Sequence, residues 1–405
     1  MEARPFGRSP RARSRTSSST SVTWVPPPSS SGPMPSSRCI AFPCVAKRSA
    51  TTGVRTSPFP SGASSSTCSN PQRKTQGDER TIMVSEPSPW RVVVSDHAFP
   101  NLDVERDVLT TAGAVLEEAS AHRDAMWLAH LATAEALLVQ WATIDADVLS
   151  RLTNCKLIVR YGIGLDNVDV DAATACGIRV SNVPDYGLDE VADHASALVL
   201  AGMRRLPHLH AHAQQGRWSD TPERPLRALD VSTLGLAGFG GIGRRVARRL
   251  QAFGMSVVAF DPFVSDDVLA EAAVERVDFG GLLSRSDAIS VHLPLTASTS
   301  RIFDADAFAA MRDGSVFVNT SRGGVVDEAA LLASLDAGSV AFAGLDVVVS
   351  EPPANDAPLL RHPRALVTGH NAWYSEQSIA RLHQHAAEEV VRAMRGEPLR
   401  YCVNP

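Results

Sequence analysis

A glycine-rich stretch near the middle of the chain restricts the possible folds more than any other feature. It follows an apolar, strand-like run at 234–237 and leads into a helix-like run at 244–253. Its glycines form a G-x-G-x-x-G pattern, made by Gly238, Gly240 and Gly243. Such glycines allow a tight turn, a close approach of the backbone to a pyrophosphate, and close packing of helix on strand. Because free N–H groups and a partial positive charge at a helix start attract phosphates, the stretch predicts a dinucleotide-binding turn.

A carboxylate further along the chain indicates which dinucleotide binds. A second strand-like run at 256–260 ends at Asp261, eighteen residues after Gly243. An acidic residue at this distance accepts hydrogen bonds from the ribose hydroxyls of the adenosine. The four residues at 262–265 include no Arg or Lys, which a 2′-phosphate would favour. The sequence therefore favours NAD over NADP as the cofactor.

Composition excludes several classes of protein. A length of 405 residues is enough for two domains. The net charge of −5 argues against a nucleic-acid partner, and no apolar run approaches the roughly 20 residues that span a membrane. The six cysteines form no C-x-x-C pair, which is typical of reduced thiols in the cytoplasm. His208, His210 and His212 alternate without a carboxylate or thiol to complete a ligand set, so we predict no metal site.

The first 88 residues differ in composition from the rest. They are rich in Ser, Pro, Thr and Arg, and no acidic residue lies between Glu2 and Asp78. Without a helical or strand-like period, 1–88 is predicted to be a disordered N-terminal extension. Such a stretch is either an organelle transit peptide or an upstream extension of the gene model, with Met83 as the working start. We favour the gene-model extension, and hence a cytoplasmic protein, because the compact part begins just after Met83, at Arg91.

Strand-like and helix-like runs alternate through the remaining chain. The strand-like runs lie at 91–95, 114–116, 136–139, 157–161, 179–182, 234–237, 256–260, 288–292, 315–319, 341–345 and 365–368. This alternation predicts parallel sheets with helices on both faces, in which ligands bind beyond the carboxyl ends of the strands. A long amphipathic helix at about 188–205 is interpreted as the passage from a first domain to a second.

Three reactive side chains follow strand ends of the second domain: Arg322, Glu351 and His370. The imidazole can donate a proton to the alkoxide that develops when a hydride reaches a 2-oxo acid. A carboxylate hydrogen-bonded to that imidazole favours its charged form, and a guanidinium can clamp and polarise the substrate oxygens. Three such groups on one rim indicate an active site. In the first domain, Gly162 and Gly164 also follow a strand end and can form a backbone cradle for a carboxylate.

These motifs together resemble the D-isomer-specific 2-hydroxyacid dehydrogenase family, from about Arg91 to the C-terminus. The matching segments are 160–169, 238–243 with Asp261-Pro262, 292–296, 319–328, 344–347 with Glu351-Pro352, and His370. Within the family, 182–186 and 372–376 look most like the branch that includes the C-terminal-binding proteins. The resemblance implies an α/β fold of two doubly wound parallel-sheet domains with an active-site cleft between them.

The resemblance also implies the boundaries and roles of these domains. A flavodoxin-like substrate-binding domain would comprise 89–186 and 373–405, and a helix at 375–395 would return the chain to it. A Rossmann NAD-binding domain would comprise 187–372 and would form most of a homodimer interface.

Residue roles follow from the same resemblance. The catalytic residues would be Arg322, Glu351 and His370. The cofactor-binding residues would be Gly238, Phe239, Gly240, Gly241, Ile242, Gly243, Asp261, His292, Pro294, Thr299, Thr320 and Asp346. The substrate-binding residues would be Tyr161, Gly162, Ile163, Gly164 and Trp373. Among these, Asp346 would hold the nicotinamide carboxamide, the backbone of Ile163 and Gly164 would bind the substrate carboxylate, and Trp373 would flank the substrate side chain.

Two positions depart from the pattern of the family. The family usually has proline immediately before the catalytic histidine, where this chain has Gly369. Glycine loosens the backbone that aims the imidazole, so we expect a less rigid loop. Asn371, immediately after the histidine, is also unusual at its position.

Two functions compete for this sequence. The first is an NAD-dependent oxidoreductase that interconverts a small D-2-hydroxy acid and its 2-oxo acid. The second is an NAD(H)-sensing scaffold that recruits protein partners, as a corepressor does. Because Arg322, Glu351 and His370 are all present, the sequence favours the enzyme.

Overall fold

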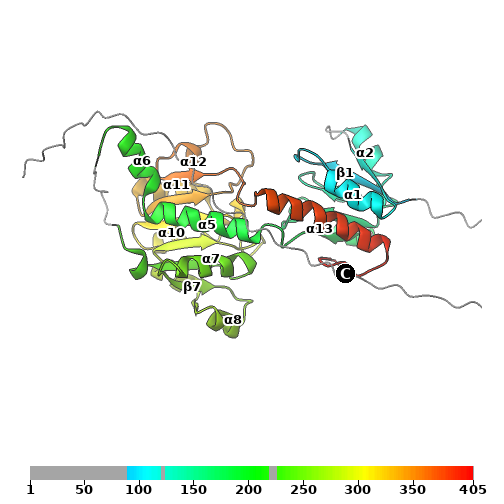
Figure 1. Ribbon diagram of the computed structural model, residues 1–405. Helices are drawn as coiled ribbons and strands as arrows, with labels where there is room; N and C mark the ends of the chain where they lie inside the picture. The colour runs from blue at the N-terminus through cyan, green and yellow to red at the C-terminus, as the bar shows by residue number, and fades with distance from the viewer. Residues whose placement is uncertain (1–88, 120–123, 219–225, 405) are drawn as a thin grey trace, which may run out of the picture. The chain divides into compact units, whose positions relative to one another are not determined.

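The computed structural model describes residues 89–119, 124–218 and 226–404 (Figure 1). The chain divides into two units, Met1–Thr81 and Ile82–Pro405, and the described residues all belong to the second unit. The predicted disorder of 1–88 therefore lies outside the described residues. Within the described parts, the strands form two parallel sheets, and this confirms the predicted α/β class with two parallel-sheet domains.

The first sheet has the strand order β2-β1-β3-β4-β5. Its strands are β1 (Arg91–Asp96), β2 (Val115–Glu118), β3 (Ala136–Val139), β4 (Leu157–Arg160) and β5 (Arg179–Ser181). Its helices are α1 (Asp103–Thr111), α2 (Ala125–Leu131), α3 (Ala146–Leu149), α4 (Val170–Ala175) and, from the end of the chain, α13 (Glu376–Met394). The strands β1, β3 and β4 are largely apolar because both faces are covered: Val92 and Val94 pack into the core under α1 and α13, and Val93 into the core under α2.

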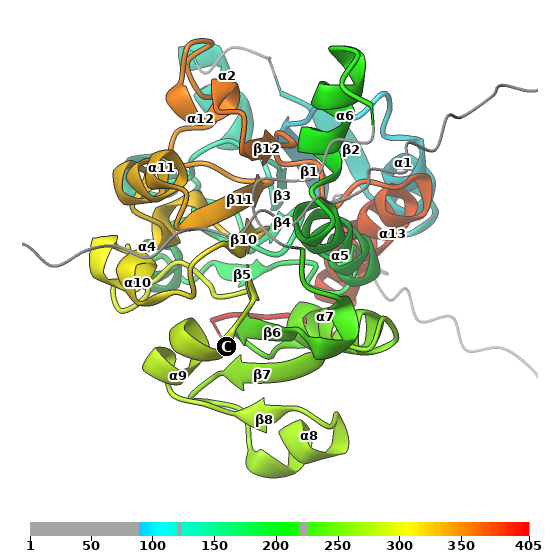
Figure 2. The same cartoon turned by 90° about the vertical axis from the view of Figure 1, so that its left-hand side faces the viewer.

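The second sheet has the strand order β12-β11-β10-β9-β6-β7-β8. Its strands are β6 (Thr233–Ala237), β7 (Ser256–Phe260), β8 (Glu275–Arg276), β9 (Ala288–Val291), β10 (Ser315–Asn319), β11 (Val340–Leu345) and β12 (Ala365–Val367). The helices after α4 are α5 (Leu188–Met203), α6 (Leu206–Gln214), α7 (Gly241–Gln251), α8 (Asp266–Glu271), α9 (Phe279–Arg285), α10 (Ala305–Ala310), α11 (Glu328–Ala337) and α12 (Pro358–Arg361). The helices α5 and α7 cover one face of this sheet, and α9, α10 and α11 cover the other (Figure 2). The strand order reverses between β6 and β9, which is where ligands bind in such sheets.

The structure differs from the sequence prediction mainly in short elements. The helices α2, α3, α6, α8, α9 and α12 and the two-residue strand β8 are not predicted from the sequence. Several of them are too short for a periodic pattern and are instead started by side-chain caps, as when Asp145 accepts the N–H of Val148 at the start of α3. The helix after the glycine turn begins at Gly241 rather than at 244.

No helix of the described residues is both long enough and apolar enough to cross a membrane.

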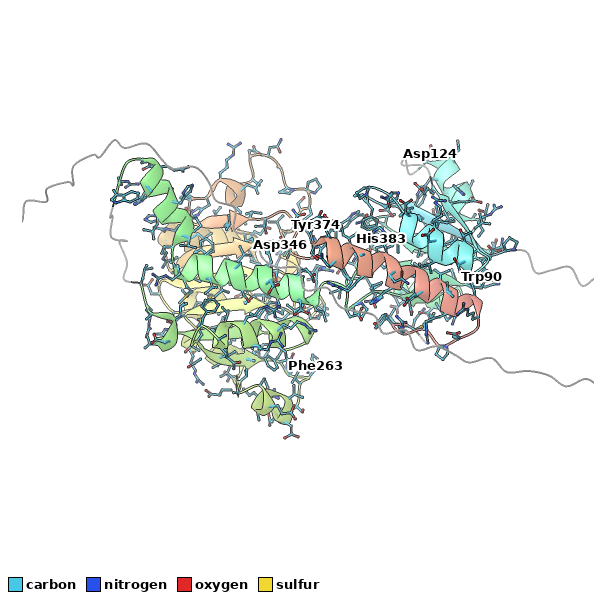
Figure 3. All side chains as sticks on the ribbon, viewed as in Figure 1. Trp90, Asp124, Phe263, Asp346, Tyr374 and His383 are labelled. Carbon is cyan, nitrogen blue, oxygen red and sulfur yellow. The ribbon has the colours of Figure 1, made fainter. Side chains whose placement is uncertain are left out.

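A buried polar network ties α13 to the first sheet. Glu105 on α1 is fully buried, and its carboxylate accepts a hydrogen bond from the Tyr161 hydroxyl at 2.8 Å. The other oxygen of Glu105 lies 2.9 Å from Nδ1 of His383, which lies on α13 (Figure 3). Burial, and then the charge of Glu105, raise the pKa of Tyr161 well above its ordinary value, so the phenol remains a donor.

We predict that Glu105→Leu lowers the free energy of unfolding by about 3 kcal/mol, because it removes the acceptor of two buried donors. Urea titration measures this change. The control is Asp107→Ala, an exposed carboxylate on the same helix, which should change the free energy by no more than about 0.5 kcal/mol. Equal effects of the two substitutions would contradict a stabilising role of the network.

Candidate active site

A cavity of about 600 Å³ is lined by residues that follow strands of both sheets. It brings together many of the site residues predicted from the sequence: Ile163, Gly164, Ile242, His292, Pro294, Thr320, Arg322, Asp346, His370 and Trp373. Of the remaining ones, Tyr161 does not line this cavity, because its ring packs into the core against Phe99 and its hydroxyl faces Glu105. Thr299 lies in an exposed turn, where its hydroxyl donates to the carbonyl of Pro294 at 2.6 Å.

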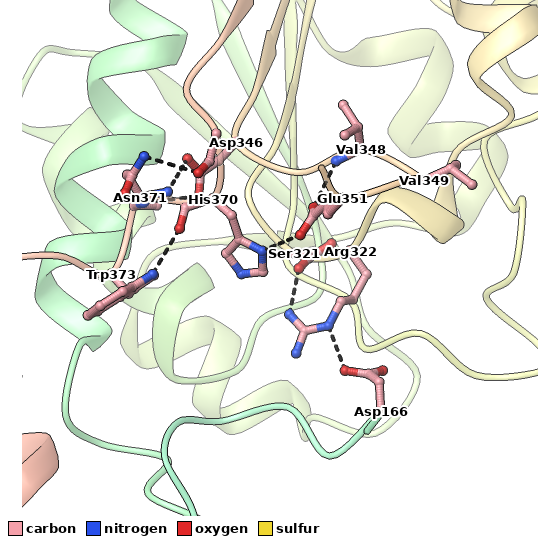
Figure 4. Close-up of polar contacts among 12 residues, drawn as sticks. Asp166, Ser321, Arg322, Asp346, Val348, Val349, Glu351, His370, Asn371 and Trp373 are labelled. Carbon is pink, nitrogen blue, oxygen red and sulfur yellow. Dashed lines mark hydrogen bonds and ion pairs between the residues drawn. The ribbon is translucent and has the colours of Figure 1, made fainter. Parts of the chain in front are cut away.

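The imidazole of His370 is paired with Glu351 (Figure 4). Nδ1 of His370 and Oε2 of Glu351 are 2.6 Å apart, and Oε1 of Glu351 accepts the N–H of Val348 at 3.0 Å. Burial would raise the pKa of Glu351, but the hydrogen bond and charge of His370 outweigh burial and lower it. The carboxylate is therefore ionised near neutral pH. Because Nδ1 is engaged, Nε2 is the nitrogen available to a substrate oxygen.

The guanidinium of Arg322 also lies at this cavity and joins the two sheets. Its Nε donates to Oδ2 of Asp166 at 2.8 Å, and its Nη1 donates to the carbonyl of Ser321 at 2.8 Å (Figure 4). Burial would raise the pKa of Asp166, but the hydrogen bond and charge of Arg322 lower it overall. The remaining nitrogen, Nη2, lies so close to Gly164 that a Cβ there would come within 1.6 Å of it. The glycine therefore makes room for the arginine.

A second guanidinium, that of Arg160, was missed by the sequence reasoning. It lines the same cavity, and its carbon lies 5.6 Å from the ring centre of Trp141. Its Nε is buried without a hydrogen-bond partner, and burial lowers the pKa of the guanidinium. A Cβ at Gly162 would lie 1.9 Å from its Nη1. The sequence signal was the position of Arg160 at the end of β4, ahead of the two glycines.

The loop that carries His370 is held by Asp346, which is 2% exposed. The carboxylate of Asp346 accepts the N–H groups of Asn371 at 2.9 Å and Ala372 at 3.0 Å. It also accepts the hydroxyl of Thr368 at 2.6 Å. A histidine that sequence reasoning missed, His194 on α5, lies 2.9 Å from that hydroxyl. No local signal in the sequence connects His194 with this loop.

The glycine turn has the close contacts that the motif predicts. Gly238 has a φ of +95°, and a Cβ there would come within 2.7 Å of the carbonyl oxygen of His292. A Cβ at Gly243 would lie 2.4 Å from the carbonyl oxygen of Gly238, whereas one at Gly240 would meet nothing within 4 Å. The open side of Gly240 fits a close approach by a pyrophosphate.

Asp261 fixes the backbone around this turn. Its Oδ2 accepts the N–H of Phe239 at 2.8 Å, and its Oδ1 accepts the N–H of Phe263 at 2.9 Å. Phe263 is 95% exposed (Figure 3). Arg276 on β8 donates to the carbonyl oxygen of Asp261 at 2.6 Å and to the carboxylate of Asp266. Arg276, which these contacts place beside Asp261, is thus already hydrogen-bonded.

Two buried polar atoms on the cavity wall fit a bound cofactor. Nδ1 of His292 and Oγ1 of Thr320 are buried without hydrogen-bond partners, and both residues line the cavity. Burial lowers the pKa of His292 from 6.5 to about 4, so its ring is neutral. Unpaired buried groups are costly, and the polar groups of a nicotinamide nucleotide would satisfy them.

No group of three or more His, Cys, Asp or Glu that could hold a metal ion occurs in the described parts of the chain.

Comparison with known proteins gives consistent matches. Residues 196–372 match the sequence model described as "D-isomer specific 2-hydroxyacid dehydrogenase, NAD binding domain". The chain is 40% identical over 271 residues to D-3-phosphoglycerate dehydrogenase of Archaeoglobus fulgidus, covering 67% of this chain and 51% of that protein. It is 41% identical over 278 residues to the enzyme of the same name from Mycobacterium tuberculosis, covering 68% and 52%. The chain thus spans about half the length of these relatives.

Solved structures match over nearly their whole length. D-lactate dehydrogenase from Aquifex aeolicus, complexed with NAD and lactic acid, has a TM-score of 0.71 and 28% identity, covering 78% of this chain and 99% of that chain. A glyoxylate reductase from Paecilomyes thermophila has a TM-score of 0.71 and 30% identity, covering 78% and 98%. None of these matches addresses the predicted likeness to C-terminal-binding proteins, which stays a prediction.

We predict that the protein loses stability as the pH falls, in part through His292. The folded state keeps this ring neutral down to a pH of about 4, whereas the unfolded chain binds a proton below about 6.5. The free energy of unfolding therefore falls through this window as the pH decreases, by about 2 kcal/mol from this residue at pH 5. Urea titrations near pH 7.5 and pH 5 measure the change. His292→Gln should show a weaker pH dependence, and an equal one would contradict the assignment.

Proposed function

Because this chain belongs to the D-isomer-specific 2-hydroxyacid dehydrogenase family, we propose that it is an NAD-dependent oxidoreductase. It interconverts a small D-2-hydroxy acid and the corresponding 2-oxo acid. The observation that carries the proposal is the 2.6 Å pair of His370 and Glu351, because His370 lines the same cavity as Arg322.

The residues of the cavity can perform the proton transfer of this reaction. Bound NADH supplies the hydride for reduction of the carbonyl carbon, and NAD accepts it in the reverse direction. During reduction, protonated His370 donates the proton at Nε2 to the developing alkoxide oxygen, and Glu351 stabilises the imidazolium through Nδ1. Arg322 binds and polarises the substrate oxygens through Nη2, the nitrogen that Asp166 and Ser321 leave open. During oxidation, neutral His370 takes the hydroxyl proton.

The cofactor site fits NAD. Gly240 leaves open space for the pyrophosphate, and Asp261 follows β7, where the ribose hydroxyls are expected. Arg276 contacts the backbone of this loop and the carboxylate of Asp266, so it is not free for a 2′-phosphate. These contacts support NAD rather than NADP.

Arg160 supports a narrower class of substrate. Arg322 suffices for the 2-oxo acid group, whereas Arg160 adds a second guanidinium to the same cavity, and its buried Nε has no hydrogen-bond partner. Burial lowers the pKa of this guanidinium, so an anion bound beside it would stabilise its charged form. We therefore propose an acid whose side chain carries a second negative charge. The relatives named D-3-phosphoglycerate dehydrogenase favour a phosphorylated acid of this kind.

Further expectations from the sequence stay proposals. These are the substrate-binding domain at 89–186 and 373–405, the NAD-binding domain at 187–372, the homodimer, and the cytoplasmic location. The packing of α13 beside α1 supports the first of them. A plant relative, from Arabidopsis thaliana, is named "D-3-phosphoglycerate dehydrogenase 3, chloroplastic". Mass spectrometry of the native N-terminus therefore tests the transit-peptide alternative.

The proposed activity is tested with NADH and a panel of 2-oxo acids, by following NADH consumption. We predict that His370→Ala lowers kcat about 1,000-fold, because the proton donor is lost, and leaves NADH affinity unchanged. The control is His210→Ala, an exposed histidine on α6, which should retain full activity. If the wild type binds NADH tightly but consumes it with none of the acids, the oxidoreductase proposal fails and the NAD(H)-sensing scaffold is favoured.

The substrate class is tested with Arg160→Met, which keeps much of the side chain and removes the charge. We predict that KM rises at least about tenfold for acids with a second anionic group, such as oxaloacetate or phosphohydroxypyruvate. KM for pyruvate should change much less. The control is Arg151→Met, at an exposed position. A similar change in KM for both classes of acid would exclude Arg160 as the second anion site.

A further inference from the structure

The backbone that carries His370 has an uncommon conformation. Gly369 and His370 both lie in the left-handed region, with φ values of +65° and +58°. Residues other than glycine rarely adopt this conformation, and it persists only where the surroundings hold it. The structure must therefore contain contacts that hold this loop.

Asp346 supplies one set of these contacts, on the N–H side of the loop. Its carbonyl oxygen accepts the N–H of His370 at 2.6 Å, and its carboxylate accepts the next two N–H groups. These bonds fix the chain at and after the histidine. The carbonyl oxygens of Thr368 and Gly369 are acceptors and need donors, which the acceptor oxygens of Asp346 cannot supply.

Asn371 supplies the second set of contacts, on the carbonyl side. Its side-chain Nδ2 donates to the carbonyl oxygen of Thr368 at 2.9 Å and to that of Gly369 at 3.0 Å. An amide –NH₂ group has two hydrogens, one for each carbonyl. The side chain thus spans the glycine and holds the peptide groups on both sides of it.

Gly369 is the residue at which this restraint is needed. A Cβ at this position would meet only one atom within 4 Å, Nδ2 of Asn371 at 3.6 Å, so packing does not restrain the glycine. Proline is fixed at a φ of about −65° and could not adopt the observed +65°. The loop therefore cannot be stiffened by proline in this conformation.

From this geometry we propose that Asn371 is a positioning residue for His370. Its side chain restrains Gly369 and so keeps the imidazole at hydrogen-bonding distance from Glu351. This inference rests on the proposed function, because it takes His370 as the acid/base. It differs from the sequence-based expectation of a looser loop, because in this proposal the Asn371 side chain supplies the restraint that glycine lacks. A small misplacement of a reacting group is enough to lower the rate strongly.

The test uses the full chain and two substitutions, Asn371→Ala and Asn371→Asp. Alanine removes both hydrogen bonds, and aspartate keeps the shape but turns an oxygen toward two carbonyl oxygens. Both should lower kcat about tenfold, with KM for the 2-oxo acid and the affinity for NADH changed less than about threefold. The control is Asn355→Ala, at an exposed position in the same part of the chain, which should leave kcat unchanged.

A second measurement separates positioning from general stability. Amide hydrogen exchange of a peptide that contains 368–373 should accelerate in both Asn371 variants, while the thermal midpoint stays within about 2 °C of wild type. Unchanged kcat, or a loss of kcat accompanied by an equal loss of NADH binding and thermal stability, would overturn the proposal. If the wild type reduces no acid in the panel, the oxidoreductase proposal fails, and the exchange rates alone then decide whether Asn371 restrains the loop.

Discussion

The geometry of the candidate site depends on one buried carboxylate, that of Asp346. A buried carboxylate without partners would be strongly destabilising, but this one accepts hydrogen bonds from Thr368, Asn371 and Ala372. The contact is possible because β11 and β12 are neighbours in the sheet, so the residue after β11 lies beside the loop after β12. The same bonds that satisfy the carboxylate shape the loop that carries His370.

The glycines of the first domain make room for two arginines, which the sequence pattern did not indicate. The sequence pattern indicates backbone N–H groups that bind a carboxylate. In the structure, Gly162 and Gly164 leave space for the guanidinium groups of Arg160 and Arg322, which a Cβ at either position would strike. Backbone N–H groups and guanidinium groups would both bind an anion beside Gly162 and Gly164. The arginines contribute positive charge and directed N–H donors, and the glycines allow the guanidinium groups to lie close to the backbone.

The larger elements of the fold could be predicted because their signals are local. The strands around the glycine turn, the helices α5 and α7, and the turn itself follow from periodicity and glycine spacing. The network of Glu105, Tyr161 and His383 could not be predicted, because its members lie 56 and 278 positions apart. No local pattern shows that a histidine on α13 contacts a carboxylate on α1. Nor does one show that His194 contacts the hydroxyl of Thr368.

The sequence by itself determined the order of the strands other than β8, the glycine turn with Asp261, and the reactive residue types that follow the strands. It did so because periodicity, turn formation and helix starts depend on neighbouring residues. Only the tertiary structure decided that Glu351 pairs with His370, that Arg322 reaches Asp166 from 156 positions away, and that Arg160 lines the same cavity with its buried Nε unbonded. Those contacts depend on the strand order of two sheets and on which side chains the folded chain brings together.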